Sequence, residues 1–486
     1  MPRTPLLLLM AALALVTSGC RKQPEGAVKV VVIGGEPKLV DPAKGPLTLP
    51  QEVLLQNVAQ GLVRFDAAGN IVPGLAERWN VSDDGLSYIF RIASTHWADG
   101  RKITADQIAK LLERQLSSRG KNGLKDSLGA IDDIVAMTDR VIEVRLLAPR
   151  PNLLSLLAQP ELAIVRNGRG TGPFTTSPAG GGLRLTREIV SADEESSVRE
   201  EVLLASTPTA AAAVLNFAAA RSDLVLGGTF ADLPYAEHAN LPRNSLRFDP
   251  ASGLFGLIPL SAGGPFDKPE VRRLLSQAID RDAFVTALAV PGLAPRATLL
   301  EPGLDGMPPP VAPPWFGTAK VDRLAGLQAE INELFPKAEK PAISIALPQG
   351  PGADLLFQLL ARDWGALGFT IERVEPGADA DFALLDRVAP SSSPAWFVRR
   401  FRCAVAPVCD SDADDLMDAA REIPVPAQRY ALLAQAAGKI DEAQLFIPIA
   451  APVRWSLVSR RIDGFAGNRF ARHTLTDLTQ RPDSGG

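Results

Sequence analysis

The sequence predicts an α/β fold organised as two successive blocks. Segments with strand-like patterns alternate with helix-like segments in each block, and this alternation is typical of α/β domains. The chain has 486 residues, enough for roughly three domain-sized units, and its 46% apolar and 22% charged residues are ordinary for globular proteins. The net charge of −4 gives no indication of binding to nucleic acid or to an anionic membrane surface, so any contact with a membrane is expected through a lipid anchor only.

The first block begins with an apolar run at 28–33, interrupted only by Lys29, which predicts a buried strand. Thr104 precedes Ile108 and further apolar residues at helical spacing, with Gln107 three residues on, so we expect Thr104 to cap a helix. The other expected elements are a helix at 53–62, strands near 62–65, 71, 86–92, 141–147 and 223–226, a glycine-rich loop at 168–172 and an alanine-rich helix at 207–220.

The second block follows an apolar segment at 254–260 and contains a proline-rich loop at 308–314. The strands expected after this loop lie at 342–347, 369–374, 382–385 and 446–450, and the helices at 353–367 and 427–445. Strands and helices again alternate, so the second block is also expected to be an α/β unit.

Residues 265–284 read PFDKPEVRRLLSQAIDRDAF and predict two short helices. Asp267 is placed to cap the first helix, with Glu270 at the capping-box position, and Asp280 is placed to cap the second. Apolar residues form one stripe at helical spacing: Val271, Leu274, Leu275, Ala278 and Ile279. Because Arg272 and Arg281 fall off this stripe, we expect the charges to be caps and a solvated helix face.

The first twenty residues have the pattern of a signal peptide. Arg3 supplies a positive charge, and an apolar run follows at 6–16, which is shorter than the roughly 20 residues of a membrane span. The run leads into Thr17-Ser18-Gly19-Cys20, which resembles a bacterial lipobox; an ordinary signal peptide with an incidental Cys is the alternative. We expect a signal peptide at 1–20, a tether at 21–27, and a mature protein held by lipid on Cys20 in the periplasm or at the cell surface.

Two cysteines remain beyond Cys20, and they lie close together at Cys403 and Cys409. In an oxidising compartment this spacing favours a disulfide between them, and two free thiols are the alternative. A metal site is disfavoured because no histidine lies near them in the sequence and two cysteines alone are an incomplete ligand set.

Several segments, in order, resemble the solute-binding proteins of family 5, the large periplasmic peptide- and nickel-binding subunits of ABC importers. The most specific are QNVAQGLVRFDAAGNIVPGLAERWNVSDDGLSYIFRI at 56–92 and the segment at 265–284. The others are GGEPKLVDPA at 34–43, WADGRKITADQI at 97–108, GTGPF at 170–174 and AQRYALLAQAAGKIDEAQLFIPIA at 427–450. The resemblance spans essentially the whole mature chain.

The resemblance implies a two-lobed periplasmic-binding-protein fold of type II, with an extra subdomain in lobe I. Lobe I would comprise 28–252 and 450–486, and lobe II 261–448, joined by crossing strands near 254–260 and 446–452. A ligand would bind in the cleft and be buried by hinge closure. The family implies a monomeric binding protein that delivers peptides to an ABC permease and its ATPase, without cofactor, metal or catalysis.

The resemblance also gives candidate ligand-binding residues. The segment that follows DPA lines the cleft in the family, and here it contains Leu47, Thr48 and Leu49. Asp386 is a candidate for the acid that receives a peptide ammonium group, and Trp396 for an aromatic wall. A loop carboxylate and a core anchor are the respective alternatives.

Arg399, with Arg400 beside it, is a candidate receptor for an anionic group, and a surface pair is the alternative. The sequence departs from the family here, because the run at 386–401 lacks the aromatic and acidic pattern of many peptide binders. A non-peptide solute, such as a metal chelate or a sugar, therefore stays open, as does a sensing or scavenging lipoprotein without a role in transport.

Other motifs indicate no chemistry. Asp410, Asp412 and Asp414 do not form a calcium loop, because Asp415 and Arg421 occupy positions that require Gly and Glu. We expect these acids to cap a helix. The three histidines are scattered, and neither a GxSxG nor an HExxH motif is present, so the sequence gives no support to a hydrolase.

Overall fold

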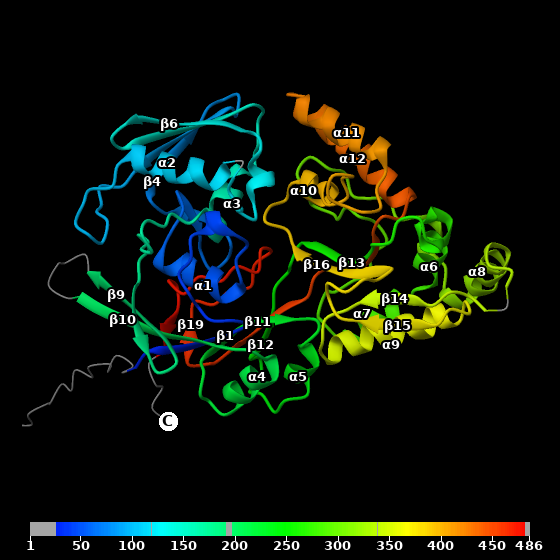
Figure 1. The fold of residues 1–486 in the computed structure, drawn as a ribbon. Helices are drawn as coiled ribbons and strands as arrows, with labels where there is room; N and C mark the ends of the chain where they lie inside the picture. Colours follow the sequence, from blue (N-terminus) through cyan, green and yellow to red (C-terminus); the bar gives the residue numbers. More distant parts are fainter. Residues whose placement is uncertain (1–25, 118, 191–196, 338, 482–486) are drawn as a thin grey trace, which may run out of the picture.

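Two lobes lie side by side in the computed structural model (Figure 1). The structure describes residues 26–117, 119–190, 197–337 and 339–481. Lobe I is built from 26–252 and 451–481, and lobe II from the single stretch 253–450. Within the described ranges, none of the helices has the length and apolar character that crossing a membrane requires. Cys20, the signal peptide at 1–20 and most of the tether at 21–27 lie outside the described residues.

Lobe I is centred on a seven-stranded sheet in the order β12-β18-β11-β1-β10-β9-β8. The strands are β1 (Val28–Ile33), β8 (Thr175–Ala179), β9 (Gly182–Val190), β10 (Ser197–Thr207), β11 (Leu224–Thr229), β12 (Leu246–Phe248) and β18 (Arg454–Val458). β1 pairs in parallel with β10 and β11, and β18 enters antiparallel between β11 and β12. The apolar run at 28–33 therefore forms a strand, as predicted, and this strand lies at the centre of the sheet.

Side chains of β1 alternate between the two faces of the sheet, as the two-residue period of a strand requires. Val30 and Val32 pack with Leu54 of α1 (Leu49–Val58). Val31 packs against the cluster on the other side, which includes Val214 of α4 (Ala210–Ala218). Figure 1 accordingly shows α1 and α4 on opposite faces of this sheet, with the short α5 (Leu233–Glu237) next to α4.

A second sheet forms the subdomain that the resemblance implied in lobe I. Its order is β4-β5-β7-β6, with β4 (Ala76–Val81), β5 (Ser87–Ile92), β6 (Ile131–Thr138) and β7 (Val141–Leu146). α2 (Ala105–Leu116) packs on it, and the side chain of Thr104 caps this helix as expected. The remaining elements are the pair β2 (Val63–Phe65) and β3 (Ile71–Pro73), α3 (Leu153–Leu157), and the pair β19 (Ile462–Asp463) and β20 (Thr479–Gln480).

Lobe II contains a five-stranded sheet in the order β15-β14-β16-β13-β17. The strands are β13 (Gly253–Pro259), β14 (Ile343–Ala346), β15 (Ile371–Val374), β16 (Phe382–Val388) and β17 (Ile447–Ala450). One face packs on α6 (Pro269–Ala278), α7 (Arg281–Leu288), α8 (Lys320–Leu334) and α9 (Pro351–Gly365). The other packs on α10 (Pro394–Arg399), α11 (Ser411–Glu422) and α12 (Pro426–Glu442).

The chain crosses between the two sheets at 249–252 and at 451–453. The resemblance had implied crossing strands near 254–260 and 446–452, but β13 pairs with β16 along its whole length and belongs to lobe II. Beside the crossings, Phe230 of lobe I and Phe255 of lobe II meet edge to face, with ring centroids 4.8 Å apart. The backbone N–H of Gly352 on α9 also donates to the carbonyl of Ala231 at 2.8 Å.

The solvated face expected for the helices at 265–284 is wrong for two of its arginines. Arg272 is 1% exposed and Arg281 is 3% exposed. Arg272 donates from Nη2 to Ala443 O at 2.6 Å and from Nε to Gln444 O at 3.1 Å, which are carbonyls just past α12. Arg281 donates to Pro448 O and to Ser276 O, each at 2.7 Å. Each guanidinium satisfies carbonyl groups at a helix C-terminus, where the helix dipole also favours a cation.

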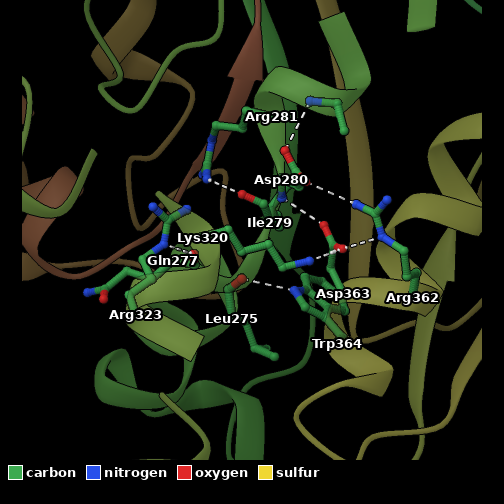
Figure 2. Close-up of polar contacts among 11 residues, drawn as sticks. Leu275, Gln277, Ile279, Asp280, Arg281, Lys320, Arg323, Arg362, Asp363 and Trp364 are labelled. Carbon is green, nitrogen blue, oxygen red and sulfur yellow. Dashed lines mark hydrogen bonds and ion pairs between the residues drawn. The ribbon is translucent and has the colours of Figure 1, made fainter. Parts of the chain in front are cut away.

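Figure 2 shows the polar contacts around these helices. Asp280 caps α7 as predicted, because its carboxylate accepts the N–H of Ala283 at 3.0 Å. The fully buried Asp363 accepts the N–H of Asp280 at 2.7 Å and pairs with Lys320 and Arg362. Burial, reinforced by repulsion from Arg323, lowers the pKa of Arg281 to about 9.

The capping expectation was wrong for Asp267. The N-cap of α6 is Lys268, and the Asp267 carboxylate instead accepts the N–H of Gly263 at 2.7 Å. The acids near 410 behave as expected, because Asp410 caps α11 by accepting the N–H of Ala413 at 2.8 Å. Just before this helix, a disulfide joins Cys403 and Cys409.

Candidate functional site

A cavity of about 350 Å³ lies where the two lobes meet. It opens at the carboxyl ends of the parallel strands β1 and β11, the edge at which open α/β sheets bind ligands. Lobe I contributes residues of β1, α1, β11 and the C-terminal segment, and lobe II contributes the end of β16 and the loop after it. The lining includes Ile33, Leu49, Glu52, Gly227 to Thr229, Asp386 to Pro390, Arg454, Trp455 and Phe470 to His473.

Two glycines of β11 shape one wall of the cavity. The register of β11 against β18 shifts between Val225 and Gly228, which marks a bulge. Gly227 has a φ of +98°, and a Cβ on Gly228 would lie 2.0 Å from the ring of Trp455. The absence of side chains at this bulge therefore lets the indole lie flat on the strand, where its Nε1–H donates to Thr229 O at 2.8 Å.

Asp386 of lobe II and Arg454 form an ion pair in the cavity wall, with 2.9 Å between Arg454 Nη1 and Asp386 Oδ1. Asp386 lies near the end of β16, and Arg454 is the first residue of β18, directly after the second crossing. Burial raises the pKa of Asp386, and the neighbouring Arg454 opposes that rise. The pair thus places one charge of each sign at the junction of the lobes.

A second charged group is centred on Arg472 in the C-terminal segment. Its guanidinium pairs with Glu52 of α1 and, at 3.3 Å, with Glu161, and its Nε donates to Gln159 Oε1 at 3.1 Å. Burial, together with repulsion from Glu52, raises the pKa of Glu161, and Arg472 counteracts this rise. Next in the chain, His473 Nε2 lies 3.1 Å from Asp249 Oδ2, and both residues line the cavity.

Hydrogen bonds between the lobes hold the cleft shut in this conformation. The buried Gln159 of lobe I donates to Pro390 O of lobe II at 2.8 Å, and Asn152 Nδ2 donates to Ser391 Oγ at 2.8 Å. In the other direction, Arg429 of α12 donates to Pro149 O at 2.9 Å. All three contacts join lobe I to lobe II, two of them through the loop after β16 and one through α12.

The segment predicted to line the cleft does so only through Leu49, the first residue of α1. Thr48 is the N-cap of α1, and its N–H donates to Gln51 Oε1 at 3.0 Å. Leu47 packs beside a small apolar cluster that includes Leu55. The helix begins earlier than the expected residue 53, because Thr48 and Gln51 form a capping box.

The candidates from 386–401 have separate positions. Asp386 lies in the cavity wall. Trp396 on α10 is partly buried, with its ring 5.0 Å from that of Phe397, and it packs against the core beneath α10 to α12. Arg399 donates to Ser127 Oγ of lobe I at 2.7 Å, so it contacts the other lobe rather than the cavity.

Several cavity residues had no signal in the sequence. Glu52 and Arg472 pair across a separation of 420 residues, so no local pattern joins them. Arg454 could have been found from its place beside the crossing near 446–452. Across the described ranges, no cluster of three or more His, Cys, Asp or Glu side chains is arranged to hold a metal.

The comparisons with known proteins agree with this architecture. A family model described as bacterial extracellular solute-binding proteins, family 5 middle, matches residues 70–387. The di/tripeptide-binding protein 1 of Pseudomonas aeruginosa is 23% identical over 513 residues, which cover 90% of this chain and 92% of that protein.

Two solved structures share the fold over 94% of this chain. The murein tripeptide binding protein MppA of Escherichia coli has a TM-score of 0.80 at 18% identity, with 99% of its chain covered. OppA of Haemophilus influenzae, in complex with the peptide RPPGFSPFR, has a TM-score of 0.79 at 16% identity, with 100% covered.

Proposed function

The chain belongs to family 5 of the bacterial extracellular solute-binding proteins, and from this premise we propose that it captures short peptides between its lobes. Proteins of this family bind solutes and are not enzymes. In this proposal, the protein is the periplasmic component of an ABC importer and delivers its ligand to the permease. Closure of the lobes would then distinguish the loaded from the empty protein.

The observation that carries the proposal is the placement of opposite charges around the cavity. A short peptide has an ammonium group at one end and a carboxylate at the other. Asp386 with Arg454, and Glu52 with Arg472, form ion pairs within the same lining, and each pair would exchange one partner for the oppositely charged end of a peptide. Charge-assisted hydrogen bonds of this kind are among the stronger polar contacts available to a ligand.

The cavity volume favours a short ligand. About 350 Å³ is close to the lower end of the range of roughly 300–1,000 Å³ that is typical of ligand pockets. Relatives named as di/tripeptide-binding proteins are consistent with that size. We therefore propose dipeptides and tripeptides as the first ligands to test.

The binding test is a thermal-shift and calorimetric screen of the purified mature protein with dipeptide and tripeptide pools. A ligand at 100 times its Kd should stabilise the folded protein by about 2.7 kcal/mol and raise the melting temperature. Asp386→Asn should weaken peptide binding by about tenfold or more, because it removes one charge from the cavity wall. Asp463→Asn, which removes an exposed acid outside the cavity, should leave the affinity unchanged.

Two results would contradict the proposal. One is a melting temperature that responds to a metal chelate, a sugar or another solute while no peptide of any length changes it. The other is equal loss of peptide affinity in Asp386→Asn and Asp463→Asn, since the cavity would then not be the binding site.

The membrane anchor is a separate part of the proposal. We propose that lipid on Cys20 tethers the mature protein outside the cytoplasm, because Cys20 directly follows the small residues that end the apolar run. Cys20→Ala should release the protein from the membrane fraction. Retention of the processed variant in that fraction would exclude the anchor.

A further inference from the structure

The end of lobe I opposite the cleft is rich in arginine. A surface hollow of about 550 Å³ runs along the edge strand β12 and the end of β18. Four arginines line it with a single aspartate, Asp463. We call Arg243, Arg247, Arg460, Arg481 and the adjacent Arg461 the arginine surface; all five side chains are exposed.

Only part of this charge is neutralised by the protein. Arg481 pairs with Asp463 at 2.5 Å, and Arg461 pairs with Asp223 at 3.4 Å. Among the described residues, neither Arg243 nor Arg247 forms an ion pair, and Arg460 donates only to the backbone carbonyl of Arg243, at 3.2 Å. The whole chain has a net charge of −4, so this cluster of arginine side chains is a local positive patch. Such a patch indicates an anionic partner.

The described chain also begins at this end. β1 starts at Val28, and a Cβ placed on Gly26 would lie 3.8 Å from Gln480 Nε2, beside Arg481. Gly26 is the sixth residue after Cys20, and even a fully extended chain of that length spans only about 20 Å. A lipid on Cys20 would therefore keep Gly26 and the adjacent Arg481 within about 20 Å of the membrane, and the arginines of β12 and the end of β18 lie two to three strands farther along the sheet.

The cleft lies at the opposite ends of the same strands. Ile33, the last residue of β1, lines the ligand cavity, and β1 runs from the arginine surface toward it. A protein that rested on the membrane with its arginine surface would thus direct the cleft away from the lipid. Figure 1 shows both ends of the described chain on the side of lobe I that faces away from lobe II.

We propose that the arginine surface docks on anionic phospholipid headgroups of the membrane to which Cys20 tethers the protein. The inference rests on the proposed lipid anchor for its setting, because charge attraction extends only about 8 Å at physiological ionic strength and needs the tether to bring the surface close. Guanidinium groups bind phosphate oxygens in a bidentate manner, which suits them to headgroups.

The test uses protein that starts at residue 21, so that no lipid contributes to binding. Its co-sedimentation is compared with vesicles of phosphatidylcholine alone and with vesicles that also contain phosphatidylglycerol. We expect binding to the anionic vesicles only, weakening as salt rises. Arg243→Gln combined with Arg460→Gln should reduce it by about fivefold for each arginine removed.

The control is Lys337→Gln combined with Arg400→Gln, which changes the net charge equally at exposed positions of lobe II. Equal loss of binding in the two double variants would overturn the proposal, as would equal binding to neutral vesicles. Displacement by inorganic phosphate beyond that by chloride at the same ionic strength would also overturn it, because the hollow would then be a site for free anions.

Peptide binding by the same samples separates this inference from the proposed function. The arginine variants should retain the thermal shift with peptide, because the arginine surface lies outside the cavity. Vesicle binding without any peptide response would contradict the peptide proposal alone. A peptide response without binding to anionic vesicles would contradict the docking proposal alone.

Discussion

The guanidinium of Arg399, on α10 of lobe II, donates a hydrogen bond of 2.7 Å to Ser127 Oγ of lobe I. A second donor of the same group reaches the carbonyl of Asp126. Arg399 thus forms two hydrogen bonds with a short turn of the other lobe, outside the ligand cavity. Opening of the cleft must break both bonds, so Arg399 stabilises the closed conformation specifically.

Arg399→Ala should therefore weaken ligand binding by roughly tenfold, mainly through faster dissociation, because hydrogen bonds from a charged donor contribute about 1.5–3 kcal/mol. Stopped-flow and calorimetric measurements on the same ligand would test this. The exposed neighbour Arg400 provides the matched control, and Arg400→Ala should leave the dissociation rate unchanged. An unchanged rate in Arg399→Ala would show that the contact does not govern opening.

The adjacent residues Arg272 and Arg273 should differ sharply in their effects on stability. Arg272 is buried and donates to carbonyls beyond α12, so Arg272→Met leaves several buried acceptors without a donor and should cost about 3–5 kcal/mol. Arg273 forms an ion pair with Glu330 that is partly exposed, so Arg273→Met should cost less than about 1 kcal/mol. Chemical denaturation would measure both, and similar losses would argue against the capping role of Arg272.

Asp441 should make stability depend on pH. Burial raises its pKa to about 7, although its carboxylate accepts the N–H of Leu299 at 2.9 Å. The folded state therefore favours the protonated acid, and this contribution is complete below the ordinary pKa of about 3.9 and is lost as the pH rises through 7. Asp441 is partly exposed, and solvent reduces the effect of burial. We therefore expect the free energy of unfolding to fall by about 2 kcal/mol between pH 4 and pH 8.

Asp441→Asn should remove this part of the pH dependence, since an amide does not ionise and its oxygen can still accept the N–H of Leu299. Urea unfolding across the pH range would reveal the difference. The exposed Asp415 serves as the control, and Asp415→Asn should follow the wild-type profile. The assignment fails if Asp441→Asn and the wild type lose equal stability with pH.

Gly228→Ala should damage the cavity and also lower the stability of the fold, because Trp455 is fully buried in the core. The added methyl would overlap the ring of Trp455 at 2.0 Å, so the indole must leave its place on β11 and lose its bond to Thr229 O. We expect a large loss of ligand affinity and a change in tryptophan fluorescence. Gly45→Ala, where a Cβ meets no atom within 4 Å, should change neither property.

The sequence predicted the architecture better than the side-chain environments. The hydrophobic run at 28–33 and the cap at Thr104 are local signals, and both elements formed as expected. The exposure of Arg272 and Arg281 was predicted wrongly, because the spacing of residues along a helix indicates only the face on which a side chain lies. The spacing does not indicate that backbone carbonyl groups at the C-terminus of another helix pack against that face and accept hydrogen bonds there.

The cavity was harder to predict for a related reason. The resemblance to the family predicted Leu49 and Asp386 as ligand-binding residues, and both line the cavity. Glu52, Arg454 and Arg472 were missed, because their partners lie far away in the sequence, 420 residues for Glu52 with Arg472 and 68 for Arg454 with Asp386, and only the folded chain brings them together. Trp396 and Arg399 were near the right region but face a core and the opposite lobe.

The position of β18 also has a consequence for the order of folding. Lobe II is one uninterrupted insertion, and β18, which occupies the slot between β11 and β12, comes only after it. The slot stays empty until the whole of lobe II has been synthesised and, for a protein with the proposed export signal, has crossed the membrane. Lobe II can therefore complete its own sheet while β11 and β12 of lobe I still have unpaired edges.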